Sequence, residues 1–245
     1  MTRARARLGL LVPFTNTNFE PDMALMMPPG VALYAARMGG YDEDEIPDEE
    51  QMAGLGASDL DEPLRLLMGV KPDVILYGCT SATLTHGPAF DRDLALRIKG
   101  ASRAETVTAA GALVAALETL QVTKIGFASP YVAAINDMAV EFLKRSGVTT
   151  LARAEMERAL SNEEQGAITP DDVFDLALKA DHPEAEALVL SCTDMRSVET
   201  IDRLEGAIGK PVVTSNQAMA FATLRTLNIP DPIPGFGRLL ERPRP

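Results

Sequence analysis

Two stretches of the sequence place a thiol beside hydroxyl and carboxylate groups. Cys79 lies in a Gly-Cys-Thr-Ser sequence and Cys192 in a Ser-Cys-Thr-Asp sequence. Each follows a short apolar run, residues 74–78 and 187–190, that is typical of a buried strand. They are the only cysteines of the chain. Both are therefore expected at the carboxyl end of a strand, where a helix N-terminus favours the thiolate.

Two opposed thiols support two kinds of chemistry. In two-base proton exchange, one thiolate takes a proton from a carbon acid and the other thiol returns a proton on the opposite face. In nucleophilic addition, one thiolate adds to an activated double bond and the other cysteine handles the proton. A third interpretation is that both are structural cysteines, which are common in protein cores. The matched local sequence of the two favours catalysis over this third interpretation.

The residues that follow each cysteine favour an anionic substrate. Thr80 and Ser81 on one side, and Thr193 and Asp194 on the other, would each present successive backbone N–H groups and polar side chains. Such an arrangement binds a carboxylate or an enolate. One binding nest at each cysteine suits a substrate with two carboxylates, or with one carboxylate and a developing enediolate.

Composition argues against several kinds of partner. The chain has 245 residues and is 46% hydrophobic, which allows a full core in one large or two smaller domains. Its formal net charge of −12 argues against nucleic acid or an anionic membrane surface as a partner. His86 and His182 are far apart in sequence, and no CxxC or zinc-type spacing occurs. We therefore expect no metal, and with no cofactor signal in the sequence we expect no cofactor. His86 has two interpretations, as an acid in the site or as a loop residue near the site entrance, and we favour the second.

The N-terminal residues do not have the pattern of an export signal. Its basic residues precede an apolar run at 8–12 that is too short and is broken at Pro13. We interpret this run as the first strand of the fold. Without an export signal, free thiols are favoured over a disulfide, and we expect a cytoplasmic protein.

Short apolar runs alternate with helical segments along the chain. We expect strands at 8–12, 31–37, 74–78, 124–128, 148–152, 187–190 and 211–216. We expect helices at 59–68, 91–99, 109–120, 133–145, 170–180, 200–208 and 217–227, and an acidic loop or broken helix at 39–58. This alternation predicts an α/β fold with parallel sheets covered by helices on both faces. In such folds ligands bind outside the carboxyl ends of the strands.

The order of strands before the first cysteine is similar to the order before the second. We therefore expect two similar α/β domains, related by a pseudo-twofold axis, with the active site in the cleft between them. The first would comprise residues 1–108 and 216–245 and carry Cys79, and the second residues 109–215 with Cys192. The polar stretch at 153–169 is a candidate lid. Asn16 has two interpretations, as a cap of the following helix or as an amide aimed into the site.

The chain resembles the aspartate/glutamate racemase superfamily, and within it the branch of maleate cis–trans isomerases and arylmalonate decarboxylases. The matching pieces span almost the whole chain: residues 11–17 with Glu20, 78–81, 129–131 with Asn136, 190–193, 214–218 and 234–238. Decarboxylases of this branch have glycine in place of the first cysteine and an apolar stretch after the second. This chain has both cysteines, with polar residues after the second, as expected for an isomerase or a racemase.

The resemblance implies a mechanism. Cys79 would add to the double bond of maleate to give a succinyl-type intermediate, and C–C rotation and elimination would release fumarate. Cys192 would act as the partner acid or base. Asn16, Tyr131 and Asn162 match the substrate-binding positions of maleate isomerases. We add the four polar residues after the cysteines: Thr80, Ser81, Thr193 and Asp194.

Other functions stay open at this point. A two-cysteine racemase or epimerase of an amino-acid-like substrate, of the Asp/Glu or hydantoin type, is the main alternative. An arylmalonate-type decarboxylase and a non-catalytic ligand-binding protein are less favoured. The expected partner is a small dicarboxylate or amino-acid-like substrate, and we expect a homo-oligomer.

Overall fold

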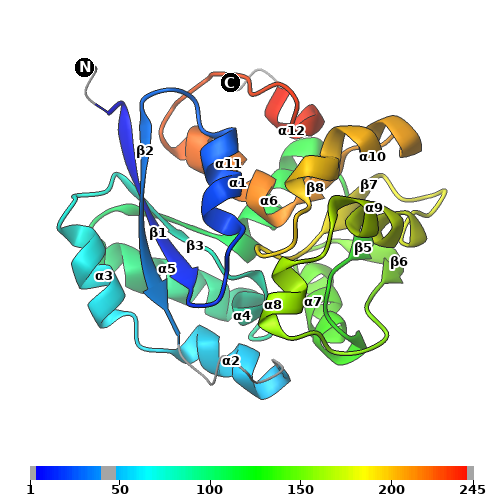
Figure 1. Cartoon of the computed structure of the whole chain (residues 1–245), viewed down its shortest axis with the longest axis horizontal. Helices are drawn as coiled ribbons and strands as arrows, with labels where there is room; N and C mark the ends of the chain where they lie inside the picture. Colours follow the sequence, from blue (N-terminus) through cyan, green and yellow to red (C-terminus); the bar gives the residue numbers. More distant parts are fainter. Residues whose placement is uncertain (1–3, 40–47, 242–245) are drawn as a thin grey trace.

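The computed structural model describes residues 4–39 and 48–241, which form two four-stranded parallel sheets (Figure 1). The first sheet has the order β2-β1-β3-β4 and the second the order β6-β5-β7-β8. The strands are β1 (Ala6–Pro13), β2 (Val31–Met38), β3 (Val74–Tyr77), β4 (Glu105–Thr108), β5 (Lys124–Ala128), β6 (Thr149–Ala154), β7 (Ala187–Leu190) and β8 (Val212–Thr214). The second sheet repeats the topology of the first, which confirms the expected pair of similar α/β units.

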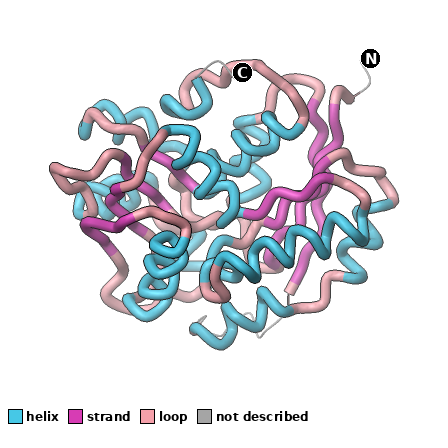
Figure 2. Tube along the Cα trace, turned by 180° about the vertical axis from the view of Figure 1, so that it is seen from behind, coloured by secondary structure: helices cyan, strands magenta, loops and turns pink. Residues whose placement is uncertain are grey.

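Helices flank both sheets, and Figure 2 shows the two sheets on opposite sides of the molecule with helices between and around them. The helices are α1 (Phe19–Met26), α2 (Glu49–Ala57), α3 (Asp61–Met68), α4 (Thr80–Leu84), α5 (Pro88–Ser102), α6 (Ala109–Leu120), α7 (Ala133–Arg145), α8 (Asn162–Gly166), α9 (Pro170–Lys179), α10 (Ile201–Ile208), α11 (Ser215–Thr226) and α12 (Gly237–Glu241). Among the described residues, none of these helices is long and apolar enough to cross a membrane.

The strands that end at the cysteines, β3 and β7, are each one of the two inner strands of their sheet. Every residue of β3 and of β7 is buried, as continuous apolar runs in a doubly covered parallel sheet should be. Gly78 follows β3 at a point where the backbone passes the ring of Phe19. A Cβ at Gly78 would lie 2.4 Å from that ring, so only glycine fits there. The chain then turns directly into Cys79 and α4.

Helices α6 and α11 lie between the two sheets. They pack on each other, α6 contacts β4 and β8, and α11 contacts β3, β4 and β8. The strands of the first sheet all fall within residues 6–108 and those of the second within 124–214. We propose the division expected from sequence, with residues 1–108 and 216–245 in one domain and 109–215 in the other.

Several elements differ from the sequence-based expectation. The strand expected at 211–216 ends at Thr214, because the Thr214 and Gln217 side chains each bond the other's backbone N–H and start α11 at Ser215. A short helix that is absent from the expected spans, α4, follows Cys79 directly. The polar lid candidate contains α8, which a Ser161 capping box starts. The acidic segment contains α2, and its residues 40–47 lie outside the described part of the chain.

Candidate active site

Both thiols line one small cavity between the two sheets. Thirteen residues line it: Pro13, Phe14, Thr15, Asn16, Leu55, Cys79, Ser81, Tyr131, Asn162, Gln165, Cys192, Thr193 and Asp194. The cysteines are unpaired and buried, with exposed fractions of 5% and 2%. The carboxyl ends of β1, β3, β5 and β7 supply most of this lining. The structure thus brings together the two strand ends that the sequence predicted would face each other.

Cys79 occupies the N-cap position of α4. Its Sγ lies 3.7 Å from the Ser81 hydroxyl. Burial raises the pKa of the Cys79 thiol, while the backbone N–H groups of Ala82 and Ser81 and the Ser81 hydroxyl hold it down. The helix start therefore stabilises the thiolate as expected, but burial in the closed cavity outweighs this effect.

Cys192 follows β7 and has fewer donors to its sulfur. The Asp194 backbone N–H donates to Cys192 Sγ at 3.3 Å, and the Tyr131 hydroxyl lies 3.3 Å from the same sulfur. Burial and, after it, the nearby Asp194 carboxylate together raise the pKa of Cys192 to about 12, against the hydrogen bonds from Tyr131 and the Asp194 backbone. Cys192 is thus held as a neutral thiol, which suits a proton donor.

Two hydroxyl groups connect the thiols. The Tyr131 hydroxyl donates to Ser81 Oγ at 3.3 Å and also contacts Cys192 Sγ. Ser81 Oγ in turn contacts Cys79 Sγ. Burial, followed by the charges of both cysteines, raises the pKa of Tyr131 well above its ordinary value, so this group is a neutral phenol. The chain Cys79–Ser81–Tyr131–Cys192 places a hydrogen-bond donor between the two sulfur atoms.

Asn16 lies two residues before Asn18, the N-cap of α1, and it also lines the thiol cavity. Its Oδ1 accepts from the backbone N–H groups of Asn18 and Phe19 at 3.1 and 2.9 Å, which fixes the start of α1. Its Nδ2 donates to Thr193 Oγ1 at 3.0 Å, and that hydroxyl donates to the Gly78 carbonyl at 2.9 Å. The amide therefore lines the cavity and joins the β1, β3 and β7 tips.

The other residues expected in the site divide into two groups. Tyr131, Asn162, Thr193 and Asp194 line the cavity beside the cysteines. Thr80 does not line it: the Thr80 hydroxyl donates to Ser215 Oγ at 2.9 Å, toward α11. The expected contact of its side chain with substrate is thus replaced by a contact between α4 and α11.

Some lining residues were not singled out from the sequence. Gln165 follows Asn162 by three positions, so both lie on one face of α8, and its amide donates to the Leu160 carbonyl at 3.0 Å. This helical spacing was the available signal, but the stretch was interpreted as a loop. Phe14 and Leu55 supply an apolar wall. His86 lies outside the thiol cavity and stacks on Phe90, with ring centroids 4.0 Å apart.

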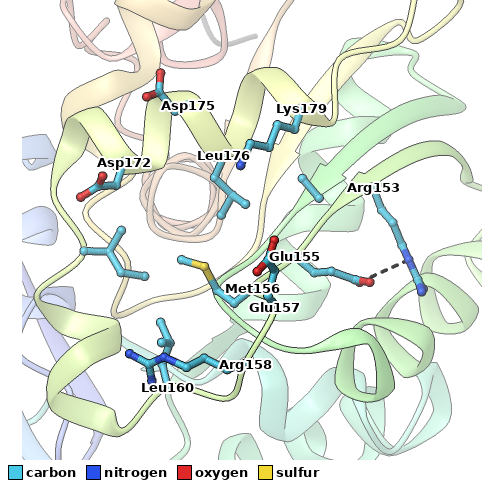
Figure 3. Close-up of a pocket in the computed structure, with 12 residues that line it drawn as sticks. Arg153, Glu155, Met156, Glu157, Arg158, Leu160, Asp172, Asp175, Leu176 and Lys179 are labelled. Atoms are coloured by element: carbon cyan, nitrogen blue, oxygen red, sulfur yellow. Dashed lines mark ion pairs between the residues drawn. The ribbon is translucent and has the colours of Figure 1, made fainter.

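A larger cavity of about 750 Å³ borders the same polar segment that carries Asn162 (Figure 3). Leu176 and Lys179 of α9 line it on one side, and the residues after β6 line the other. Charges of both signs surround it, and Arg153 pairs with Glu155 at 3.3 Å. It contains neither cysteine, so it is not the site of thiol chemistry.

The buried Asp22 carboxylate is linked through Asn216 to the loop after β7, which carries Cys192. Asp22 on α1 accepts from Asn216 Nδ2 at 2.7 Å, and the same Nδ2 donates to the Thr193 carbonyl at 3.0 Å. Burial raises the pKa of Asp22 to about 7, against the opposing hydrogen bond from Asn216. Because this pKa lies above that of the unfolded chain, the ionised form destabilises the fold at high pH, and the cost falls as Asp22 takes up a proton.

We therefore expect Asp22→Asn to be more stable than the native chain at about pH 8, by roughly 1–4 kcal/mol. The amide retains an acceptor for Asn216 without a buried charge. The difference should shrink as the pH falls toward about 4. Thermal unfolding of both proteins at the two pH values checks this, with the exposed Asp175→Asn as control. A stability difference that grows on acidification would contradict the assignment.

Comparison with known proteins places the chain among enzymes of related fold. A model of the arylmalonate decarboxylase family matches residues 8–240. Maleate isomerase of Nocardia farcinica is 30% identical over 246 residues, 96% of each chain. Arylmalonate decarboxylase of Bordetella bronchiseptica is 26% identical, covering 94% of this chain and 92% of the other.

Solved structures agree with this placement. The N. farcinica maleate cis–trans isomerase bound to TRIS is 29% identical and superposes with a TM-score of 0.87, covering 96% of this chain and 98% of the other. A mutant of the same enzyme has a covalently bound succinylcysteine intermediate, and it is 28% identical with the same TM-score and coverage.

Proposed function

The chain belongs to the arylmalonate decarboxylase family, and from this premise we propose that it is a cysteine-dependent cis–trans isomerase that converts maleate, or a close analogue, to fumarate. The observation that carries the proposal is the pair of buried thiols on one cavity, connected by the hydroxyls of Ser81 and Tyr131. A decarboxylase of the branch would lack Cys79. Thiol addition turns a double bond into a rotatable single bond without a cofactor.

The first half of the reaction forms a carbon–sulfur bond. The Cys79 thiol gives its proton to solvent, and the thiolate adds to one carbon of the double bond. The electron pair of the double bond moves toward the neighbouring carboxylate as an enediolate. The Cys192 thiol then gives its proton to the second carbon. Cys79 is suited to the nucleophilic role because its sulfur accepts two backbone N–H bonds and the Ser81 hydroxyl, whereas the Cys192 sulfur has one backbone N–H and the Tyr131 hydroxyl and has its pKa raised to about 12.

The second half reverses these steps after rotation. The central C–C bond of the succinyl adduct is now single and turns the two carboxylates to opposite sides. The Cys192 thiolate removes a proton from the second carbon, the double bond reforms, and the C–S bond to Cys79 breaks. Cys79 leaves as the thiolate and takes a proton back from solvent, Cys192 keeps the proton from the second carbon as its thiol, and fumarate is released.

Neutral hydrogen-bond donors would hold the substrate carboxylates. We assign this role to Asn16, Tyr131 and Asn162, together with Ser81 and Thr193 after the cysteines. Asp194, which was also expected to bind substrate, lines the cavity too, but its carboxylate accepts hydrogen bonds from the loop after β1 and is not a donor to the substrate. Among the described residues that line the cavity, none is a lysine or an arginine. Binding through amide and hydroxyl groups leaves the two carboxylates free to exchange positions on rotation, because neither is fixed in an ion pair.

The cavity must enlarge when substrate enters. Its volume of about 30 Å³ has room for about two water molecules, which is less than a four-carbon dicarboxylate needs. We propose that the segment at 153–169 acts as the lid. It carries Asn162 and Gln165 on the cavity side, and the 750 Å³ cavity on its border provides space for it to move.

The raised pKa of Cys79 predicts a pH dependence. The value of kcat/KM for maleate should rise with pH between about 7 and 9, by up to about tenfold per pH unit, because the thiolate fraction grows below the pKa. Cys192 has a pKa of about 12 and stays protonated across this range, so it should cause no fall. Initial rates in a constant-ionic-strength buffer series check this, and a flat profile would contradict it.

The function is tested by mixing the purified protein with maleate and following fumarate by NMR. Turnover of maleate or citraconate supports the isomerase. The alternative, a racemase that uses the same thiols as opposed bases, predicts instead that solvent deuterium enters the α-carbon of an amino acid such as aspartate or glutamate. Absence of both reactions would reject both functions.

Two further expectations stay predictions. A homo-oligomer is checked by size-exclusion chromatography with light scattering. A cytoplasmic location is checked by fractionation of cells that express the protein.

A further inference from the structure

Asn18 connects three segments of the active site. Its Nδ2 group donates to Asp194 Oδ1 at 3.0 Å, to the Asp194 carbonyl at 2.7 Å and to the Gly166 carbonyl at 3.0 Å. These atoms belong to the loop after β1, the loop after β7 and the end of α8. The segments are 148 and 176 residues away from Asn18 along the chain. One side chain therefore joins parts that only the folded structure brings together.

The Asp194 carboxylate strengthens the same junction. Its Oδ1 accepts from the backbone N–H groups of Thr17 and Asn18, at 2.8 and 3.0 Å, in addition to the Asn18 amide. The residue is 8% exposed. Hydrogen bonds to an ionised acceptor in a buried place are the strong ones. The carboxylate thus fixes the backbone of the β1 loop against the β7 loop.

Gly166 is packed directly on this junction. A Cβ at Gly166 would lie 3.1 Å from Thr17 Oγ1, 3.3 Å from Asp194 Oδ2 and 3.5 Å from Asn18 Nδ2. The first two distances are shorter than ordinary van der Waals contacts, so a side chain here would displace the junction atoms by a few tenths of an ångström. The close approach of α8 is what allows its carbonyl to reach the Asn18 amide.

Each of the three segments carries one residue of the proposed reaction within four positions of the junction. Asn16 precedes Asn18 by two residues, Cys192 precedes Asp194 by two, and Asn162 precedes Gly166 by four. The junction lies beside the reacting groups and spans both domains. A shift of about 1 Å in such groups is enough to lower a rate about a hundredfold.

On the premise of the isomerase function, we propose that Asn18 and Asp194 are positioning residues. The side-chain junction between them keeps Asn16, Cys192 and the Asn162 helix in register around one substrate. Neither side chain is required to exchange a proton with the substrate.

Substitutions of Asn18 and of Asp194 should change the kinetic constants in different ways. Asn18→Ala removes the bond to α8 and keeps the carboxylate bonds to the β1 loop, so it should mainly raise KM, by about tenfold. Asp194→Ala frees the β1 loop from the Cys192 loop, so it should also lower kcat, by about tenfold to a hundredfold. Asp194→Asn keeps an acceptor for the same N–H groups and should be intermediate. In the double variant Asn18→Ala/Asp194→Ala, the loss of transition-state stabilisation should be smaller than the sum of the losses in the two single variants. Both substitutions remove contacts of the same junction, so their effects are not additive.

A matched control is available at the other end of the second sheet. Glu186 is also a carboxylate that accepts two successive backbone N–H groups, from Thr123 and Lys124 at 2.7 and 3.0 Å. Glu186→Ala breaks a contact of the same kind and should leave KM and kcat unchanged. Thermal unfolding of each variant identifies any variant that does not fold. If Asp194→Ala does not fold, the kinetics of Asp194→Asn and Asn18→Ala test the proposal.

A second measurement does not depend on maleate. Alkylation of Cys79 and Cys192 by iodoacetamide, followed by peptide mass spectrometry, reports how tightly the three segments close over the thiols. Asn18→Ala and Asp194→Ala should raise the rate by about tenfold or more, and Glu186→Ala should not. If the native chain does not isomerise maleate, the proposed function fails while this measurement still tests the junction. Native KM, kcat and alkylation rates in both junction variants would overturn the inference.

Discussion

Cys79→Ala is expected to reduce maleate isomerisation by at least about a thousandfold. The Cys79 sulfur forms the only covalent bond to substrate in the proposed reaction. Cys192 cannot replace it as the nucleophile, because a pKa of about 12 keeps the Cys192 thiol neutral. Fumarate formation followed by NMR measures the loss.

A more conservative variant isolates the cause. Cys79→Ser keeps a polar atom beside the Ser81 hydroxyl and the N–H groups of α4, so the local geometry is preserved. It should be almost as inactive as the alanine variant, because a hydroxyl at this position is a far weaker nucleophile than a thiolate. If either variant retained more than about a tenth of native activity, Cys79 would not be the nucleophile.

Cys192→Ser is expected to accumulate a covalent adduct on Cys79 when maleate is added. Protonation of the enediolate tolerates a hydroxyl or water as the donor, but removal of the proton before elimination needs a base. The Cys192 thiolate supplies that base, and a serine hydroxyl does not. The forward step should therefore outrun the release of product, and turnover should fall by about a hundredfold to ten-thousandfold.

Intact-protein mass spectrometry detects the adduct as an increase equal to the mass of one maleic acid. Peptide mapping should locate it on Cys79. The double variant Cys79→Ala/Cys192→Ser should show no increase, which excludes addition at another nucleophile. An adduct found on Cys192 of the Cys79→Ala protein would exchange the roles of the two thiols.

The Cys79 and Cys192 variants test two sulfur atoms that have different surroundings. Cys79 is at a helix start and accepts several donors, whereas Cys192 lies beside the Asp194 carboxylate. The same carboxylate holds the β1 loop, so a single residue both adds to the burial that keeps Cys192 protonated and joins the loops after β1 and β7. This combination explains why acidic Asp194 can stand in a site for an anionic substrate: its charge is turned toward backbone N–H groups.

Local patterns in the sequence were sufficient to predict the strands that carry the chemistry. The runs at 74–78 and 187–190 are apolar throughout, and burial on both faces of a parallel sheet requires that. Their ends were recognisable from the abrupt change to polar residues. The duplicated order of strands followed from the same local evidence, and the structure confirms it in two identical sheet topologies.

Elements shorter than two helical turns were less predictable. Helices α4 and α8 have five residues each, too few for an apolar periodicity to appear. Their starts depend on contacts with the backbone, such as the Ser161 capping box of α8. The prediction that Asn162 lies in the site therefore depended on the family resemblance. Gln165, which lies on the same face of α8, was not predicted as a site residue.

The sequence by itself determined which residues could react: two cysteines at strand ends, with polar neighbours, in a duplicated α/β chain. Only the tertiary structure decided their protonation and their alignment. Burial sets the pKa of both thiols, and burial depends on which segments close over the strand ends. The contacts of Asn18 with Gly166 and Asp194 join segments more than a hundred residues apart, and no local pattern encodes such a pairing.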